Sequence, residues 1–209
     1  MTKKDTKTLT IHLVLDRSGS MAICREATIK AVRDYIKEVA KSAPDSTITI
    51  TTFDDHPFET PVDGAKISKA TFKEEDFAPR GMTPLYDAIG YGVNKLDKTT
   101  GDNKALIILT DGAENASKEY DEKDIKKLLE KRQKKDGWLV VYLGANQDAW
   151  AVGQKFGTQF GNTMSFDTGN VGATMRSVSI STANYAATGD AQGASFTDAD
   201  RKKAKEKSK

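Results

Sequence analysis

The sequence lacks the features that would place it in an oxidising compartment or in a membrane. It contains a single cysteine, Cys24, so no disulfide can form within the chain. No apolar run approaches the ~20 residues that a membrane-spanning helix requires. The short apolar run near the start is interrupted by His12, which is unlike the apolar core of a secretory signal peptide. We therefore expect a cytoplasmic protein that is not attached to a membrane.

A strong net charge is also missing. The 32 Lys and Arg residues nearly balance the 30 Asp and Glu residues, which leaves a formal net charge of +2. Such a balance gives little reason to expect nucleic acid or a membrane surface as a partner. The basic excess lies partly in residues 201–209 (RKKAKEKSK), which we interpret as a solvated end of the chain. A salt-sensitive contact with nucleic acid is the alternative there.

Common catalytic motifs are absent from the sequence. It has no G-x-S-x-G nucleophile elbow and no G-x-x-x-x-G-K-[ST] phosphate loop. The two histidines, His12 and His56, are poorly placed for a catalytic triad, since His12 falls in the middle of an expected strand. Metal-bound water could support hydrolysis, but no general base stands out. We predict that the protein is not an enzyme and has no small-molecule substrate.

What the sequence does contain is an alternation of strands and helices. The apolar, β-branched runs at 8–15 and 105–109 are typical of strands that are buried on both faces. The expected strands cover residues 8–15, 47–53, 56–64, 105–109, 138–143 and 162–166, and the expected helices cover 22–41, 83–96, 121–135, 148–156 and 171–186. This alternation predicts an α/β fold with a mostly parallel central sheet and helices on both faces. Two prolines in 56–64 favour a short antiparallel edge strand there.

The chain divides into three expected parts. Residues 1–7 form an N-terminal arm, and residues 8–187 form one α/β domain. Residues 188–209 are polar and then basic, so we expect a disordered tail. Within the domain, helical periodicity over 22–41 puts Ile23 on the inner face of the first helix.

Oxygen-bearing side chains occupy three loops of the expected domain. Asp16, Ser18 and Ser20 alternate in DRSGSM directly after the first strand, Thr83 lies in GMTPLYDAI, and Asp111 follows the strand ALIIL. The carboxyl ends of parallel strands meet at one edge of a sheet, so the loops after the two strands are expected to lie close together. Carboxylates and hydroxyls are hard ligands that suit Mg²⁺ or Mn²⁺ and match zinc or copper poorly.

These residues carry a resemblance to a known family. The Asp16–Ser18–Ser20 loop resembles the D-x-S-x-S loop of the metal-ion-dependent adhesion site of von Willebrand factor A (vWA) domains, and Thr83 and Asp111 match that site's threonine and second aspartate. The resemblance covers roughly residues 8–187. It implies a Rossmann-like sheet and one Mg²⁺ or Mn²⁺ ion whose open coordination position accepts Glu or Asp from a partner protein. The segment YLGANQDAW is similar to stand-alone vWA proteins of bacteria and phages, which points to a bacterial or phage-infected cell.

Several of these residues have a second interpretation. Thr83 is also a good N-cap for the helix that Pro84 would open. Residues 54–56 (DDH) are typical of a solvated turn, with a partner-facing surface as the alternative. Glu114 and Asn115 could support the ligands or start a helix.

The residues and the resemblance together predict a metal-dependent protein-binding module that binds an acidic residue of its partner through the Mg²⁺ or Mn²⁺ ion. The alternative is a subunit of a larger assembly, either an AAA+ ATPase complex or a virion or other structural assembly. In that case the metal site would be regulatory or structural.

Overall fold

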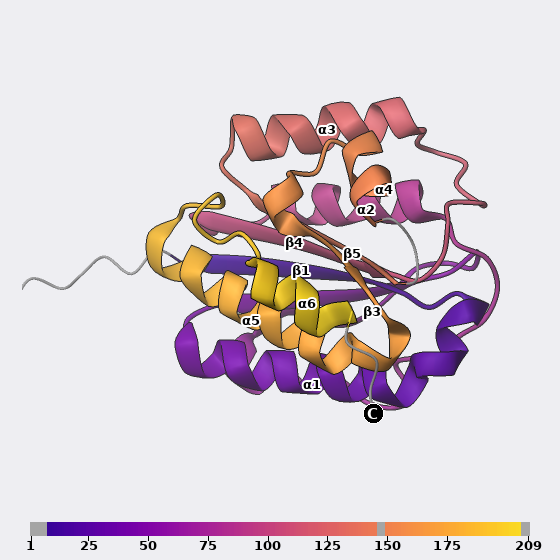
Figure 1. Ribbon diagram of the computed structural model, residues 1–209, viewed down its shortest axis with the longest axis horizontal. Coiled ribbons are helices and arrows are strands. Elements are labelled where there is room, and N and C mark those ends of the chain that lie inside the picture. The colour runs from indigo at the N-terminus through magenta and orange to yellow at the C-terminus, as the bar shows by residue number, and fades with distance from the viewer. Residues whose placement is uncertain (1–7, 146–148, 206–209) are drawn as a thin grey trace, which may run out of the picture.

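The computed structural model describes residues 8–145 and 149–205, which form a six-stranded sheet between two layers of helices (Figure 1). The strand order is β3-β2-β1-β4-β5-β6, and β3 alone runs antiparallel to its neighbour. The strands are β1 (Leu9–Asp16), β2 (Thr47–Phe53), β3 (Glu59–Lys66), β4 (Asn103–Thr110), β5 (Leu139–Ala145) and β6 (Thr163–Phe166). This confirms the predicted Rossmann-like α/β class and its antiparallel edge strand.

Helices cover both faces of the sheet (Figure 1). One face carries α2 (Leu85–Asp97), α3 (Glu122–Lys134) and α4 (Ala149–Lys155), and the other carries α1 (Arg25–Ser42), α5 (Val171–Thr188) and α6 (Asp198–Lys205). Short 3-10 turns are η1 (Gly19–Cys24), η2 (Ile67–Lys69), η3 (Phe160–Asn162) and η4 (Thr168–Asn170). Because helices cover both faces of the sheet, the central strands are apolar at nearly every position.

The side chains of the central strands alternate between two hydrophobic cores. In β4, Ile107 and Leu109 join the core beneath α1 and α5, whereas Leu106 and Ile108 join the core beneath α2 and α3. Successive strand side chains point to opposite faces, so one strand supplies both cores. The resulting double burial fixes the register of β1 against β4 and therefore the relative positions of the loops that follow them.

The start of the first helix differs from the prediction. Helical periodicity extended the helix back to residue 22 with Ile23 inward, but α1 begins at Arg25 and Ile23 is 82% exposed. The preceding residues form η1 instead, and the backbone N–H of Gly19 donates to the carbonyl of Gly81. A loop held by such a contact does not continue the periodicity of the helix, so Ile23 points away from the core.

The C-terminal segment also differs from the prediction. Residues 189–205, which we expected to be disordered, contain α6, and Phe196 and Ala204 are buried against the core of α1 and α5. Arg201 donates to the backbone carbonyls of Thr163 and Phe160, so the helix covers the outer edge of β6. Residues 1–7 and 206–209 lie outside the described part of the chain. No helix among the described residues is long and apolar enough to span a membrane.

Candidate metal centre

The first part of the site is the β1 loop (residues 16–21), which leaves the sheet at its carboxyl edge. Asp16 is fully buried, and both of its carboxylate oxygens have partners. Oδ1 accepts the backbone N–H of Ser18 at 2.7 Å, and Oδ2 accepts the hydroxyl of Thr110 at 2.5 Å. Thr110 is the last residue of β4. The carboxyl ends of β1 and β4 therefore lie close together, as the sequence predicted. The carboxylate of Asp16 is therefore fixed in position by β4.

The second part is the β4 loop (residues 111–120), which approaches the β1 loop through its first residue. The hydroxyl of Ser20 donates to Oδ1 of Asp111 at 2.6 Å, and the hydroxyls of Ser18 and Ser20 lie 3.2 Å apart. Ser18 is buried, Asp111 is half-buried and Ser20 is exposed. The site thus has a buried floor and a mouth open to solvent.

The third part is the threonine loop (residues 79–83), which brings Thr83 against the β4 loop. A Cβ atom placed on Gly112 would lie 2.6 Å from the hydroxyl oxygen of Thr83 and 3.4 Å from Oδ2 of Asp16. Only glycine allows this close approach. Thr83 is not the N-cap that the sequence suggested. The N-cap of α2 is Pro84, which makes no side-chain capping hydrogen bond.

Glu114 and Asn115 hold the threonine loop and the start of α2. Oδ1 of Asn115 accepts the backbone N–H of Thr83 at 2.8 Å, and the N–H of Asn115 donates back to the carbonyl of Thr83. Oε2 of Glu114 accepts the N–H of Tyr86 in the first turn of α2. Asn115 thus supports a predicted ligand, while Glu114 satisfies a free amide at a helix start.

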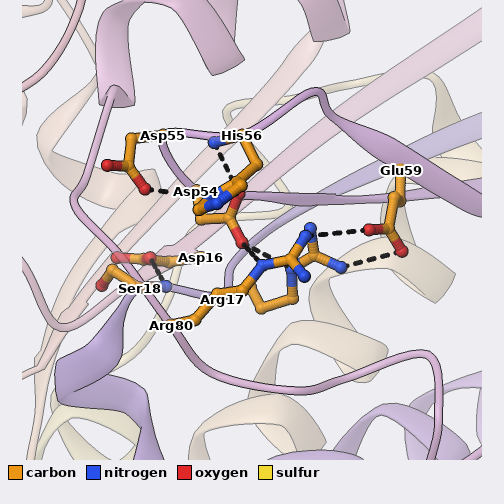
Figure 2. A network of polar contacts seen from close by, with 8 residues as sticks. All are labelled: Asp16, Arg17, Ser18, Asp54, Asp55, His56, Glu59 and Arg80. Atoms are coloured by element: carbon orange, nitrogen blue, oxygen red, sulfur yellow. Dashed lines mark hydrogen bonds and ion pairs between the residues drawn. The ribbon is translucent and has the colours of Figure 1, made fainter.

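An ionic cluster with a buried centre connects the threonine loop to the end of β2 and the start of β3 (Figure 2). Oδ2 of the fully buried Asp54 lies 3.1 Å from Nε of Arg17 and 2.8 Å from Nε of Arg80, and both arginines also contact Glu59. The solvated turn expected at residues 54–56 is therefore wrong for Asp54. Sequence reasoning missed Arg80, because an ion pair between distant loops leaves no periodic pattern in the sequence.

The family assignment follows from comparison with known proteins. The family model of the von Willebrand factor type A domain matches residues 10–179. The chain belongs to this family. No curated protein matches the chain in sequence.

Solved structures share the fold of this vWA domain at low sequence identity. The pilus adhesin SpaC from Lactobacillus rhamnosus GG aligns with a TM-score of 0.68 at 16% identity, over 87% of this chain and 31% of that chain. The PilB minor pilin from Streptococcus sanguinis gives 0.64 at 14%, over 88% of this chain and 63% of that chain. The vWF domain of the type V pili tip protein Mfa5 from Porphyromonas gingivalis gives 0.64 at 11%, over 83% and 94%. The chain therefore spans less than two thirds of PilB and about a third of SpaC.

Electrostatics favour a cation in the candidate site of this vWA domain. Burial raises the pKa of Asp16 to about 6, although the hydrogen bonds from Thr110 and Ser18 lower it and the charge of Asp111 raises it further. Burial also raises the pKa of Asp111, against the hydrogen bond from Ser20. Two carboxylates in this environment are destabilised in their charged form, and a nearby cation relieves that destabilisation.

The chemistry of the donors fits a hard divalent cation. The candidate ligands are three hydroxyls and two carboxylates, with no thiolate or imidazole among them. The group Asp54, Asp55 and His56 also brings possible ligand atoms within 4.8 Å of one another. It fits a cation less well, because Arg17 and Arg80 already bind Asp54 and place positive charge beside it.

Proposed function

We propose that this vWA domain binds one Mg²⁺ or Mn²⁺ ion through Asp16, Ser18, Ser20, Thr83 and Asp111, and that a partner protein completes the ion's coordination with Glu or Asp. The observation that carries the proposal is the convergence of the three loops. The contact Ser20–Asp111 joins the β1 and β4 loops, the contact Thr110–Asp16 joins the β1 loop to the end of β4, and Gly112 brings Thr83 against them.

The burial of the donors supports a site that is open on one side. Asp16, Ser18 and Thr83 are at most 2% exposed and form the floor, whereas Ser20 and Asp111 are accessible. Held in this way, the donors need little rearrangement to bind, which reduces the entropy lost on binding. A bound Mg²⁺ or Mn²⁺ would supply a Lewis-acid contact for an oxygen ligand from outside.

Charge explains why the partner's ligand should be acidic. The carboxylates of Asp16 and Asp111 balance the two positive charges of the ion, so the site itself does not repel a further carboxylate. A carboxylate meeting a cation at short range is a strong and directional contact.

Apolar side chains beside the mouth support contact with another protein. Met82, which directly precedes Thr83, is 51% exposed, and Ile23, three residues after Ser20, is 82% exposed. Methionine and other apolar side chains at a protein interface exclude water around a polar contact. We assign these two residues to the rim of the partner-binding surface.

The proposal is tested by capture of partners from cell extract on immobilised protein. Wild type is compared in Mg²⁺ and in EDTA, and with Asp16→Asn and Thr83→Ala in Mg²⁺. The matched control is Asp45→Asn, since Asp45 is exposed and lies outside the site. The same partner should be retained by wild type and Asp45→Asn in Mg²⁺ and lost in EDTA or with either site variant. A partner that stays bound to Asp16→Asn in EDTA would contradict the proposal.

The alternative function, a subunit of a larger assembly, draws support from the names of the structural neighbours. PilB is named as a minor pilin and Mfa5 as a pili tip protein. If the ion only stabilised the fold in such an assembly, a folded Asp111→Ala variant would still assemble with its native partners. Loss of assembly by that folded variant would favour the binding function. Cytoplasmic location and the absence of catalysis stay predictions. Cell fractionation tests the location.

A further inference from the structure

A cavity of about 270 Å³ lies between the loop that joins β2 to β3, the outer side of α2 and the end of the β4 loop. Its wall combines aromatic rings with carboxylates and, among the described residues, contains no Lys or Arg. The residues that line it are His56, Pro57, Phe58, Asp87, Tyr91, Asn94, Glu119 and Tyr120. None of these residues is among the proposed metal ligands.

Three aromatic rings build the cavity wall, and each is held by its neighbours. The rings of Phe58 and Tyr91 meet edge to face with centroids 5.6 Å apart. The ring of Tyr120 packs against the backbone of α2, because a Cβ atom on Gly90 would lie 2.4 Å from it. Nδ2 of Asn94 donates to the hydroxyl of Tyr120 at 3.0 Å and fixes the orientation of that ring. Contacts within the protein therefore hold the aromatic wall in place.

Two carboxylates give the cavity a negative charge. Asp87 cannot move away, because its oxygens accept the backbone N–H groups of residues 118–120 at 2.7–2.9 Å. Glu119 is exposed beside it. Lys95 approaches the Tyr91 ring, but its Nζ is ion-paired with Asp63 at 2.8 Å. Negative charge beside aromatic faces favours a cationic ligand, because the faces of aromatic rings also attract cations.

One end of the cavity lies close to the threonine loop of the proposed metal site. Asp87 lies in the first turn of α2, just beyond Thr83. On the other side, Nδ1 of His56 is 3.2 Å from Oδ1 of Asp55, and Asp55 lies directly over Gly81 of the threonine loop. Figure 2 shows Asp55 and His56 on the loop next to the Asp16–Ser18 segment. A partner that reaches the metal site therefore passes close to this cavity.

We propose that the cavity is a second binding site beside the metal site and that it takes an arginine side chain of the partner protein. A planar guanidinium can stack on the rings of Tyr91 and Tyr120 while it pairs with Glu119 and the fixed carboxylate of Asp87. The cavity has room for such a side chain, and its aromatic rings suit the faces of a guanidinium while its carboxylates suit the N–H groups along the guanidinium edge. The inference rests on the proposed function only for the source of the arginine, not for its binding.

The test uses a small probe without a carboxylate, so that it cannot bind a metal. Nα-acetyl-arginine methylamide and its neutral citrulline analogue are titrated into the EDTA-treated protein, and the ring resonances of Phe58, Tyr91 and Tyr120 are followed by NMR. Arginine should give saturable shifts in the millimolar range, and citrulline should bind at least about threefold more weakly. Equal binding of the two probes, or no saturable shift, would overturn the assignment.

Variants separate the roles of charge and ring. Glu119→Gln should weaken arginine binding about threefold to fivefold, while Glu122→Gln, which removes an exposed charge outside the cavity, should leave it unchanged. Tyr120→Phe should keep the binding, and Tyr120→Leu should lose it, with the backbone spectrum confirming that each variant is folded. Binding that survives Tyr120→Leu in folded protein would contradict the proposed site. Because the probe is tested without metal, a failure here is distinct from a failure to bind Mg²⁺.

Discussion

The hydroxyl of Thr110 donates a hydrogen bond of 2.5 Å to Oδ2 of Asp16 and so connects the last residues of two neighbouring parallel strands. Residues 9–15 of β1 pair with residues 103–109 of β4, and this contact continues the alignment to the last residue of each strand. It leaves Asp16 buried, charged and oriented. Without a cation, this arrangement lowers the stability of the fold, and it is suited to hold a cation. Functional sites commonly lower the stability of a fold in this way.

Replacing Asp16 by Asn should stabilise the metal-free protein at neutral pH. The pKa of Asp16 rises from 3.8 to about 6 on folding, so the folded state binds more protons than the unfolded state between these values. Stability therefore falls as the pH rises through this window. Asn does not titrate, so in EDTA the stability of Asp16→Asn relative to wild type should increase by up to about 3 kcal/mol between about pH 4 and about pH 7.

Urea unfolding at several pH values checks this prediction, and added Mg²⁺ supplies the control. Saturating Mg²⁺ should stabilise wild type by about 3 kcal/mol at a hundredfold excess over Kd and leave Asp16→Asn unchanged. A pH-independent difference between the two proteins in EDTA would show that burial does not destabilise the charged form of Asp16.

Adding one methyl group at Gly112 should weaken metal binding while the fold persists. The new Cβ would lie 2.6 Å from the hydroxyl oxygen of Thr83 and would displace that side chain. We expect Gly112→Ala to lower Mg²⁺ affinity at least about tenfold, as loss of an oriented ligand does. Gly172→Ala is the matched control, because a Cβ there meets nothing within 4 Å. Calorimetry measures both, and equal affinities would place Thr83 outside the site.

In the ionic cluster, loss of the buried Asp54 should lower stability more than loss of the half-exposed Arg80. Asp54→Asn removes the carboxylate that faces Arg17, whose side chain is 2% exposed, and should lower the free energy of unfolding by about 3 kcal/mol. Arg80→Gln changes a side chain that is 46% exposed, so its effect on stability should be much smaller.

Arg80→Gln should instead weaken Mg²⁺ binding, since Arg80 anchors the loop that carries Thr83 to Asp54. A drop of about tenfold is expected, the size found for groups that orient metal ligands. Asp45→Asn is the control for both measurements. Equal destabilisation by Asp54→Asn and Arg80→Gln would contradict this description of the cluster.

His12 should make the protein less stable in acid. Its Nδ1 lies 3.2 Å from the carbonyl of Gly92, which can only accept, so Nδ1 carries the proton and Nε2 accepts from Thr51 at 2.8 Å. Burial lowers the pKa of His12 from 6.5 to about 4. The unfolded state therefore binds more protons between these values, and stability falls as the pH is lowered through them.

The reference protein is Asp16→Asn, in which residue 16 does not titrate. The measurement compares its free energy of unfolding with that of the double variant that also carries His12→Gln. Glutamine keeps a donor and an acceptor but does not titrate. The difference between the two should change by up to about 3 kcal/mol from about pH 7 to about pH 4. Parallel pH profiles would show that His12 titrates normally in the folded protein.

Much of the fold and the position of the candidate ligands could be predicted from the sequence. Asp16 and Asp111 directly follow strands that are buried on both faces, and the carboxyl ends of parallel strands meet at one edge. Local patterns of this kind are sufficient to bring the β1 and β4 loops together. Thr83 could be recognised from its motif, although its local sequence suggested a helix cap, and Pro84 takes that position.

Long-range contacts account for what the sequence did not predict. Arg80 and Asp54 come from different loops and meet only in the folded chain. Ile23 follows the periodicity of α1 but belongs to a turn whose start is held by Gly81. The polar composition after residue 188 indicated disorder, yet Phe196 and Ala204 supply enough apolar contact, together with Arg201, to dock α6 against β6 and the core.

Calorimetric titration of Mg²⁺, and then Mn²⁺, into EDTA-treated protein measures the proposed metal binding itself. We predict a single site in wild type and in Asp45→Asn, and no site in Asp16→Asn that retains its fold. Equal binding by wild type and Asp16→Asn would contradict the proposed site, as would wild type that shows neither binding heat nor a Mg²⁺-dependent rise in melting temperature.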